Sequence, residues 1–155
     1  MNLNLEGKTA LITGSAAGIG LNIALKLQEY GCKIGINSRH QKSIKNAETF
    51  FKDSVLGIVA DMRSEDSAKA AINQFVNEYG TLDILVCNVG SGKSASPFTE
   101  NVDDWQKSFS ENLLSAINPI SASIDYLTRS EGVITCISSI CGEKMIENAP
   151  LTYSS

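Results

Sequence analysis

The chain of 155 residues has about the length of one domain, which excludes an assembly of several large domains within it. Its 43% hydrophobic and 19% charged residues supply enough apolar material for a buried core, so a disordered or low-complexity chain is excluded. A formal net charge of −4 provides no broad cationic surface, and we expect no nucleic-acid partner.

Short apolar segments alternate with longer segments of helical periodicity along the chain. The apolar segments predict strands at Lys8–Thr13, Lys33–Asn37, Val55–Ala60, Leu82–Cys87 and Val133–Ser138. Because these segments are almost continuously apolar, helices should cover both faces of the sheet. The pattern therefore predicts an α/β fold with a doubly wound parallel sheet of about five strands.

Four intervening segments predict helices, at Gly18–Tyr30, His40–Phe51, Ser64–Tyr79 and Val102–Arg129. The third has the clearest signals, since Ser64 can cap its start and Gly80 can close its end. Pro119 lies deep in the fourth helix and removes one backbone hydrogen bond, which predicts a kink near Ser115–Asn118. Four apolar residues of this helix share one face and are expected in the core or in a subunit contact: Trp105, Phe109, Leu113 and Ile117.

The cysteines and the histidine give no metal-binding signal. Cys32, Cys87, Cys136 and Cys141 lack C-x-x-C spacing, so we expect buried thiols in a reducing cytoplasm. The only histidine, His40, has no ligand-spaced partner, and no metal site is expected. No apolar run reaches the about 18–20 residues that a membrane span needs, and no secretory signal is visible, which favours a cytoplasmic location.

Three glycines, Gly14, Gly18 and Gly20, lie within seven positions directly after the first predicted strand. The first permits a tight exit from the strand, the second a close approach of backbone to a ligand, and the third close packing of helix on strand. Such a turn presents the N–H groups of a helix start, which suit a pyrophosphate. The alternative is an ordinary strand-to-helix turn.

The spacing T-G-x-x-x-G-x-G resembles the short-chain dehydrogenase/reductase family, and further motifs follow in that family's order. The segment Cys87-Asn88-Val89-Gly90 is similar to the family's N-N-A-G but departs from it at the first Asn and at the Ala. Asp61, followed by Met62, matches the family's adenine-contacting Asp. The resemblance covers the whole chain and implies one dinucleotide-binding, Rossmann-like domain with strand order 3-2-1-4-5.

The resemblance also implies which residues contact the dinucleotide. They are Gly14, Ser15, Ala16, Gly18, Ile19, Gly20, Asp61, Met62, Asn88, Val89 and Gly90.

The end of the second strand addresses the choice between the two nicotinamide cofactors. An acid at this position accepts hydrogen bonds from the adenosine ribose of NAD, and here Ser38 takes its place, followed by Arg39. Because a hydroxyl and a guanidinium can hold a 2′-phosphate, we expect NADP(H) rather than NAD(H). The alternative is a solvated loop arginine at Arg39. Family members that use NADP often also carry a basic residue inside the glycine loop, and this chain departs from that pattern with Ala17.

By resemblance, three residues take part in hydride transfer between NADP(H) and a small carbonyl or alcohol substrate. Tyr153 would transfer the proton, Ser139 would stabilise the substrate oxygen, and Asn112, matching the family's helix-kinking Asn, would support a water relay. The family places a lysine four residues after the tyrosine, at position 157, beyond Ser155. We therefore expect the amino-terminal part of a longer enzyme, weakly active or inactive alone, whose fifth strand is left as an uncovered apolar edge.

Two other functions are compatible with parts of the pattern. A catalytically silent dinucleotide-binding sensor or scaffold would also bind NADPH, and only turnover distinguishes it. A methyltransferase on a related sheet is disfavoured by the glycine spacing and by the absence of an acid after the second strand. Family members usually pair the long helix across a dimer axis, which implies a homodimer or homotetramer.

Overall fold

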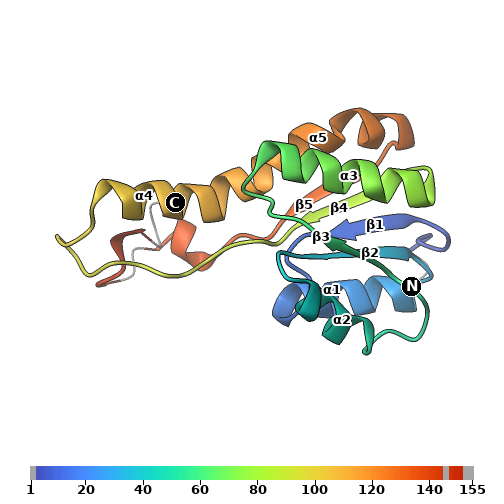
Figure 1. Cartoon of the computed structure of the whole chain (residues 1–155), viewed down its shortest axis with the longest axis horizontal. Coiled ribbons are helices and arrows are strands. Elements are labelled where there is room, and N and C mark those ends of the chain that lie inside the picture. Colours follow the sequence, from blue (N-terminus) through green and yellow to red (C-terminus); the bar gives the residue numbers. More distant parts are fainter. Residues whose placement is uncertain (1–2, 145–146, 152–155) are drawn as a thin grey trace.

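The computed structural model describes residues 3–144 and 147–151. Five strands form one parallel sheet in the order β3-β2-β1-β4-β5, as predicted (Figure 1). The strands are β1 (Thr9–Ile12), β2 (Lys33–Ser38), β3 (Leu56–Val59), β4 (Ile84–Cys87) and β5 (Val133–Cys136). The chain thus reverses its direction of winding between β1 and β4, which is where doubly wound folds bind ligands.

Helices cover both faces of this sheet. The helices α1 (Gly18–Glu29) and α2 (Gln41–Glu48) pack on one face, whereas α3 (Glu65–Tyr79) and α5 (Ser115–Ser130) pack side by side on the other (Figure 1). The helix α4 (Val102–Phe109) precedes α5 and projects beyond the edge of the sheet (Figure 1). A short 3-10 turn, Ile140–Gly142, follows β5. The fold is Rossmann-like.

The core consists of two apolar layers, one on each side of the sheet. Along β1, Leu11 faces α3 and α5, whereas Ala10 and Ile12 face α1 and α2. Phe75 is the largest fully buried side chain of the first layer, and Ile36 lies in the second. Because successive strand residues point to opposite faces and both faces are covered, the central strands need apolar residues at most positions.

Both signals that predict the ends of α3 are confirmed. The Ser64 hydroxyl accepts a hydrogen bond from the Ser67 N–H, which caps the first turn. Gly80 follows the helix in the left-handed conformation with a φ of +79°, and its N–H donates to the Val76 carbonyl. Local side-chain and backbone chemistry therefore sets both ends.

The long fourth helix departs from α-helical geometry earlier than its proline predicts. A π-helical turn occupies Ser110–Leu114, and regular α5 already includes Ser115–Asn118 and Pro119. The side chain of Asn112 explains the position, because its Oδ1 accepts a 2.7 Å hydrogen bond from the Ser91 N–H after β4. The extra residue of a π-turn re-aims a side chain, and such turns are frequent at functional sites.

The edge strand β5 leaves its apolar residues uncovered by the described part of the chain. Val133 is 55% exposed and Ile134 36%. The expectation of four buried thiols is wrong, since Cys32 and Cys87 are buried but Cys136 on β5 is exposed and Cys141 is half-buried. An edge strand has a neighbour on one side only, so an apolar sequence does not guarantee burial there.

The apolar face of the long helix also lies at the surface rather than in the core. Phe109, Leu113 and Ile117 are all exposed, and Trp105 packs against Phe109 at 6.1 Å between ring centroids. None of the helices in the described residues has the length and apolar character to cross a membrane.

Asp83 fastens the amino-terminal ends of β4 and β1 together. Its Oδ2 accepts hydrogen bonds of 2.9 Å from both the Thr9 N–H and the Thr9 hydroxyl, and its Oδ1 accepts one of 2.8 Å from the Lys8 ammonium. Burial raises the pKa of Asp83, but the hydrogen bonds from Lys8 and Thr9 outweigh it, and the pKa lies below its usual value.

Replacing Asp83 by Asn is expected to lower the free energy of unfolding by about 1–3 kcal/mol at pH 7, because donors at Thr9 and Lys8 lose a charged acceptor. A lowered native pKa stabilises the fold above the unfolded pKa of about 3.9, and this contribution is lost as the pH falls further. Urea denaturation at pH 7 and pH 3 should therefore show a difference that shrinks in acid. Asp125→Asn, on an exposed part of α5, is the control. A difference unchanged by pH would contradict the assignment.

Candidate functional site

The glycine turn after β1 has a backbone that other residues would strain. Gly14 and Gly18 have φ angles of +61° and +59°. A Cβ at Gly20 would lie 2.5 Å from Asn88 Nδ2 and 2.8 Å from the Gly14 carbonyl oxygen. The turn ends at Ala17, the N-cap of α1, where no side chain caps the helix. No side chain at the N-cap therefore takes up the first N–H groups of α1, which leaves them available to a ligand.

Asn37, at the end of β2, holds this turn from one side. The Gly14 N–H donates to Asn37 Oδ1 at 3.1 Å, and Asn37 Nδ2 donates to the Ile58 and Ala60 carbonyls at 3.2 and 3.1 Å. The Asn37 N–H also donates to the Ser15 hydroxyl at 2.9 Å. Asn37 is buried, so its carboxamide ties the ends of three strands into one rigid edge. Sequence reasoning missed this residue.

Asn88, directly after β4, holds the turn from the other side. Its Nδ2 donates to the Thr13 and Gly14 carbonyls at 3.1 and 3.0 Å, and its N–H donates to the Thr13 hydroxyl at 3.0 Å. Asn88 and the backbone of Gly14 and Ser15 together leave no room for a side chain at Gly20.

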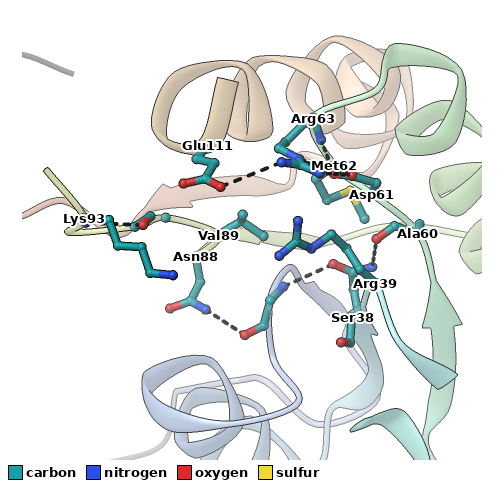
Figure 2. A pocket seen from close by; sticks show the side chains of 14 residues that line it. Ser38, Arg39, Ala60, Asp61, Met62, Arg63, Asn88, Val89, Lys93 and Glu111 are labelled. Carbon is teal, nitrogen blue, oxygen red and sulfur yellow. Dashed lines mark hydrogen bonds and ion pairs between the residues drawn. The ribbon is translucent and has the colours of Figure 1, made fainter. Parts of the chain in front are cut away.

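A cavity of about 420 Å³ opens beside the turn, over the carboxyl ends of β2, β3 and β4 (Figure 2). Its lining includes eight of the thirteen residues expected to bind the cofactor: Gly14, Ser38, Arg39, Asp61, Met62, Asn88, Val89 and Gly90. Figure 2 shows the Arg39 side chain extending into the cavity toward Val89. We call this the charged cavity, because it is also lined by Arg63, Lys93 and Glu111.

Asp61 is held by an arginine two residues later. Arg63 Nη2 lies 2.6 Å from Asp61 Oδ2, and Arg63 Nε donates to Asp61 Oδ1 at 2.9 Å. This guanidinium lowers the pKa of Asp61 below its usual value, and Arg63 Nη1 also lies 3.7 Å from Glu111 Oε1 (Figure 2). In the described part of the chain Arg39 makes no ion pair, so its charge is available to a ligand.

A second cavity of about 500 Å³ lies on the other side of the segment Asn88–Ser91, between the ends of β4 and β5 and the π-turn. It brings together Ile19, Asn112 and Ser139, three residues that are far apart in the sequence. None of the described residues that line it carries a charged side chain, and we call it the uncharged cavity.

Two of the three expected catalytic residues thus share one cavity. Ser139 begins the 3-10 turn after β5, and its hydroxyl accepts a hydrogen bond of 3.2 Å from the Cys141 N–H. Asn112 enters from the π-turn. Tyr153 lies outside the described residues.

Four of the expected cofactor residues line neither cavity and belong to the turn and the start of α1: Ser15, Ala16, Gly18 and Gly20. Ser15 is fully buried, and its hydroxyl donates to the Ile12 carbonyl at 2.6 Å. Arg63 and Glu111 were missed by sequence reasoning. The sequence did contain a signal for Arg63, because a cationic side chain two residues after Asp61 can form an ion pair with its carboxylate.

A parallel sheet in this strand order, with paired cavities at the ends of β1 to β5, defines the protein as a Rossmann-like α/β protein. A family model described as short chain dehydrogenase matches residues 8–155. The chain therefore belongs to the short-chain dehydrogenase family.

Two curated relatives and one solved structure illustrate the similarity. The chain is 31% identical to a 3-oxoacyl-(acyl-carrier-protein) reductase FabG of Chlamydia muridarum over 147 residues, which is 92% of this chain and 59% of the relative. It is 36% identical to the uncharacterized oxidoreductase YvaG of Bacillus subtilis over 122 residues, 76% of this chain and 45% of the relative. A 7α-hydroxysteroid dehydrogenase complexed with NADH and 7-oxo glycochenodeoxycholic acid superimposes with a TM-score of 0.92 at 26% identity, covering 99% of this chain and 61% of that one. The chain thus spans about half to three fifths of the length of these proteins.

Proposed function

We propose that the chain is a dinucleotide-binding domain for NADP(H) and that it serves an oxidoreductase of small carbonyl or alcohol substrates. One observation carries this proposal. The uncapped start of α1 at the glycine turn lies between a charged and an uncharged cavity that share the segment Asn88–Ser91. A dinucleotide has the same division, with a polar adenosine end, a pyrophosphate, and an uncharged ring carrying the reactive carbon.

The residues present fit such a ligand. A Cβ at Gly20 would push against Asn88 and the Gly14 carbonyl. Because glycine has none, the start of α1 packs closely on the turn that would bind a pyrophosphate. Asp61 lies in the charged cavity, where the family's adenine contact is expected. Ser38 and Arg39 line the same cavity and would bind a 2′-phosphate, the group that distinguishes NADP from NAD.

We choose NADP(H) because of the charge of the residues at the end of β2. The 7α-hydroxysteroid dehydrogenase that shares the fold was solved with NADH, so the family's fold does not decide the cofactor. Here the position that would hold an acid is Ser38, and the next residue is Arg39, which forms no ion pair with any described residue. A guanidinium favours the additional phosphate and gains nothing from the free hydroxyl of NAD.

The cofactor supplies a hydride, and the chain's own residues would place the substrate and the proton. The Ser139 hydroxyl lines the uncharged cavity and would donate a hydrogen bond to the substrate oxygen, stabilising the negative charge that develops there. Asn112, fixed by the Ser91 N–H, would hold a water that relays the proton. Tyr153 would donate or accept the proton at the substrate oxygen.

The exposed apolar face of the long helix supports a homodimer or homotetramer. Phe109, Leu113 and Ile117 lie at helical spacing on that face, which fits a self-complementary helix contact.

Oxidation of NADPH against a panel of aldehydes and ketones tests the proposed activity on the complete natural protein. Tyr153→Phe should lower kcat about 10²–10⁴-fold, because it removes the group that transfers the proton. The dissociation constant of NADPH should change little, since the tyrosine acts on the substrate. NADPH binding without turnover by the wild-type protein would instead identify a silent binding domain, and equal turnover by both proteins would exclude the role of Tyr153.

A further inference from the structure

Two consecutive residues of the π-turn line different cavities. Glu111 lines the charged cavity, and Asn112 lines the uncharged cavity. Both belong to the turn Ser110–Leu114, in which Asn112 Oδ1 accepts the 2.7 Å hydrogen bond from the Ser91 N–H. Ser91 itself lines both cavities. A displacement of Glu111 is therefore passed through one peptide unit to the residue that shapes the other cavity.

The Arg63 guanidinium connects Glu111 to the segment that follows β3. Its Nε and Nη2 donate to the two carboxylate oxygens of Asp61 at 2.9 and 2.6 Å, and its Nη1 lies 3.7 Å from Glu111 Oε1 (Figure 2). The backbone of this segment is fastened to α5, because Asn118 Nδ2 donates to the Met62 carbonyl at 3.1 Å. The planar guanidinium can therefore stay on Asp61 and contact Glu111 at the same time.

The two contacts of Arg63 differ in strength. The contact with Asp61 is a bidentate, charge-assisted pair, whereas 3.7 Å is too long for a hydrogen bond to Glu111. The Arg63 and Glu111 side chains are 31% and 19% exposed and line the same open cavity. Water in this cavity screens their attraction. A ligand that fills the cavity displaces this water, and the lower local dielectric strengthens the attraction.

We propose that Arg63 is a positioning residue that couples the filling of the charged cavity to the placement of Asn112 in the uncharged cavity. When the adenosine end of a dinucleotide fills the charged cavity, the pair of Arg63 and Glu111 closes and fixes the π-turn. The hydrogen bond between Asn112 and the Ser91 N–H then opens less often. This inference rests on the proposed function, because that function assigns the charged cavity to adenosine and Asn112 to the proton relay.

Adenosine 2′,5′-bisphosphate tests the coupling on the complete natural protein, because it carries the adenosine end and the 2′-phosphate but no nicotinamide ring. Hydrogen–deuterium exchange of the Ser91 amide reports how often its bond to Asn112 opens. At saturating ligand, exchange at Ser91 in the wild type should slow at least about fivefold, which is the lower end of ordinary coupling between sites.

Glu111→Gln isolates the contribution of the ion pair. Glutamine keeps the shape of the side chain but lacks the charge that attracts Arg63, so the slowing at Ser91 should fall below about twofold. A ligand that merely covers Ser91 would instead slow its exchange equally in both proteins. Because the comparison is made at saturating ligand, a change in affinity does not enter it.

Two further variants complete the test. Arg63→Lys keeps the positive charge, but an ammonium lacks the planar fork that contacts two carboxylates, so this variant should also lose the slowing. Glu65→Gln is the matched control, since this exposed residue in the first turn of α3 does not line the charged cavity. It should keep the full effect.

The outcomes separate this inference from the proposed function. If the wild type does not bind adenosine 2′,5′-bisphosphate, the NADP(H) site is wrong and the coupling is wrong with it. If the ligand binds but exchange at Ser91 does not slow, the coupling alone is overturned. Equal slowing in the wild type and in Glu111→Gln or Arg63→Lys overturns it as well and leaves the cofactor site in place.

Discussion

Gly20→Ala is expected to weaken NADPH binding at least tenfold and to lower the free energy of unfolding by about 1–3 kcal/mol. The added methyl would lie 2.5 Å from Asn88 Nδ2, 2.8 Å from the Gly14 carbonyl oxygen and 2.9 Å from the Ser15 Cα. Two of these three atoms belong to the backbone of the glycine turn, so a side-chain rotation cannot relieve the contact. The start of α1 must move away from β1, which misplaces the N–H groups proposed to bind the pyrophosphate.

Gly142→Ala is the matched control for the effect of this change on stability. It adds the same methyl group, but nothing lies within 4 Å of the added carbon and the backbone there needs no positive φ. Chemical denaturation and calorimetric titration with NADPH measure the two effects. If Gly20→Ala binds NADPH as tightly as the wild type, the turn does not hold the cofactor.

Arg39→Ala should lower the affinity for NADPH about 10–100-fold and leave that for NADH unchanged. A hydrogen bond to a charged group contributes about 1.5–3 kcal/mol, and each 1.4 kcal/mol corresponds to a factor of about ten. Arg39 extends into the charged cavity and makes no ion pair with another described residue, so its removal leaves no buried charge behind (Figure 2). The loss is therefore specific to the 2′-phosphate.

Lys42→Ala provides a matched loss of positive charge on α2, at an exposed residue outside the charged cavity. It should change neither dissociation constant by more than a small factor. Ser38→Asp restores the acid expected for NAD and should reverse the preference. If Arg39→Ala lowers the affinity for NADPH and NADH equally, the arginine does not bind the 2′-phosphate.

The strands were predictable because local composition indicates them, whereas their order was implied by the resemblance to the family. A central strand such as β1 needs mostly apolar residues once both faces are covered, and a nearly continuous apolar run is visible in the sequence. The ends of α3 were predictable for a similar reason, since Ser64 and Gly80 act within one turn of the helix.

The π-turn was not predictable from the same rules. Pro119 is the strongest local helix breaker, yet the irregular turn forms at Ser110–Leu114 because Asn112 bonds to Ser91, a residue of a distant loop. The prediction that all four cysteines are buried was wrong for a related reason. Cys87 and Cys136 lie in similar apolar runs, and only their places in the sheet separate them.

The candidate site shows the same division between local and long-range information. The glycine turn carries its own sequence signal, and the structure gives Gly14 and Gly18 the backbone angles that only glycine adopts readily. Asn37 carries no signal, because its role depends on carbonyl groups of β3 that lie more than twenty residues away. A residue that supports a site from a neighbouring strand can be identified only once the three-dimensional fold is known.

The central claim is that the N–H groups at the start of α1 bind the phosphates of a nicotinamide dinucleotide. Backbone amide resonances of the ¹⁵N-labelled chain, followed during titration with NADPH, test it most directly. We predict saturable shifts for the amides of Gly18, Ile19 and Gly20, together with residues of the charged cavity. Amides of these three residues that stay unmoved at saturating NADPH, in a protein that remains folded, would contradict the account.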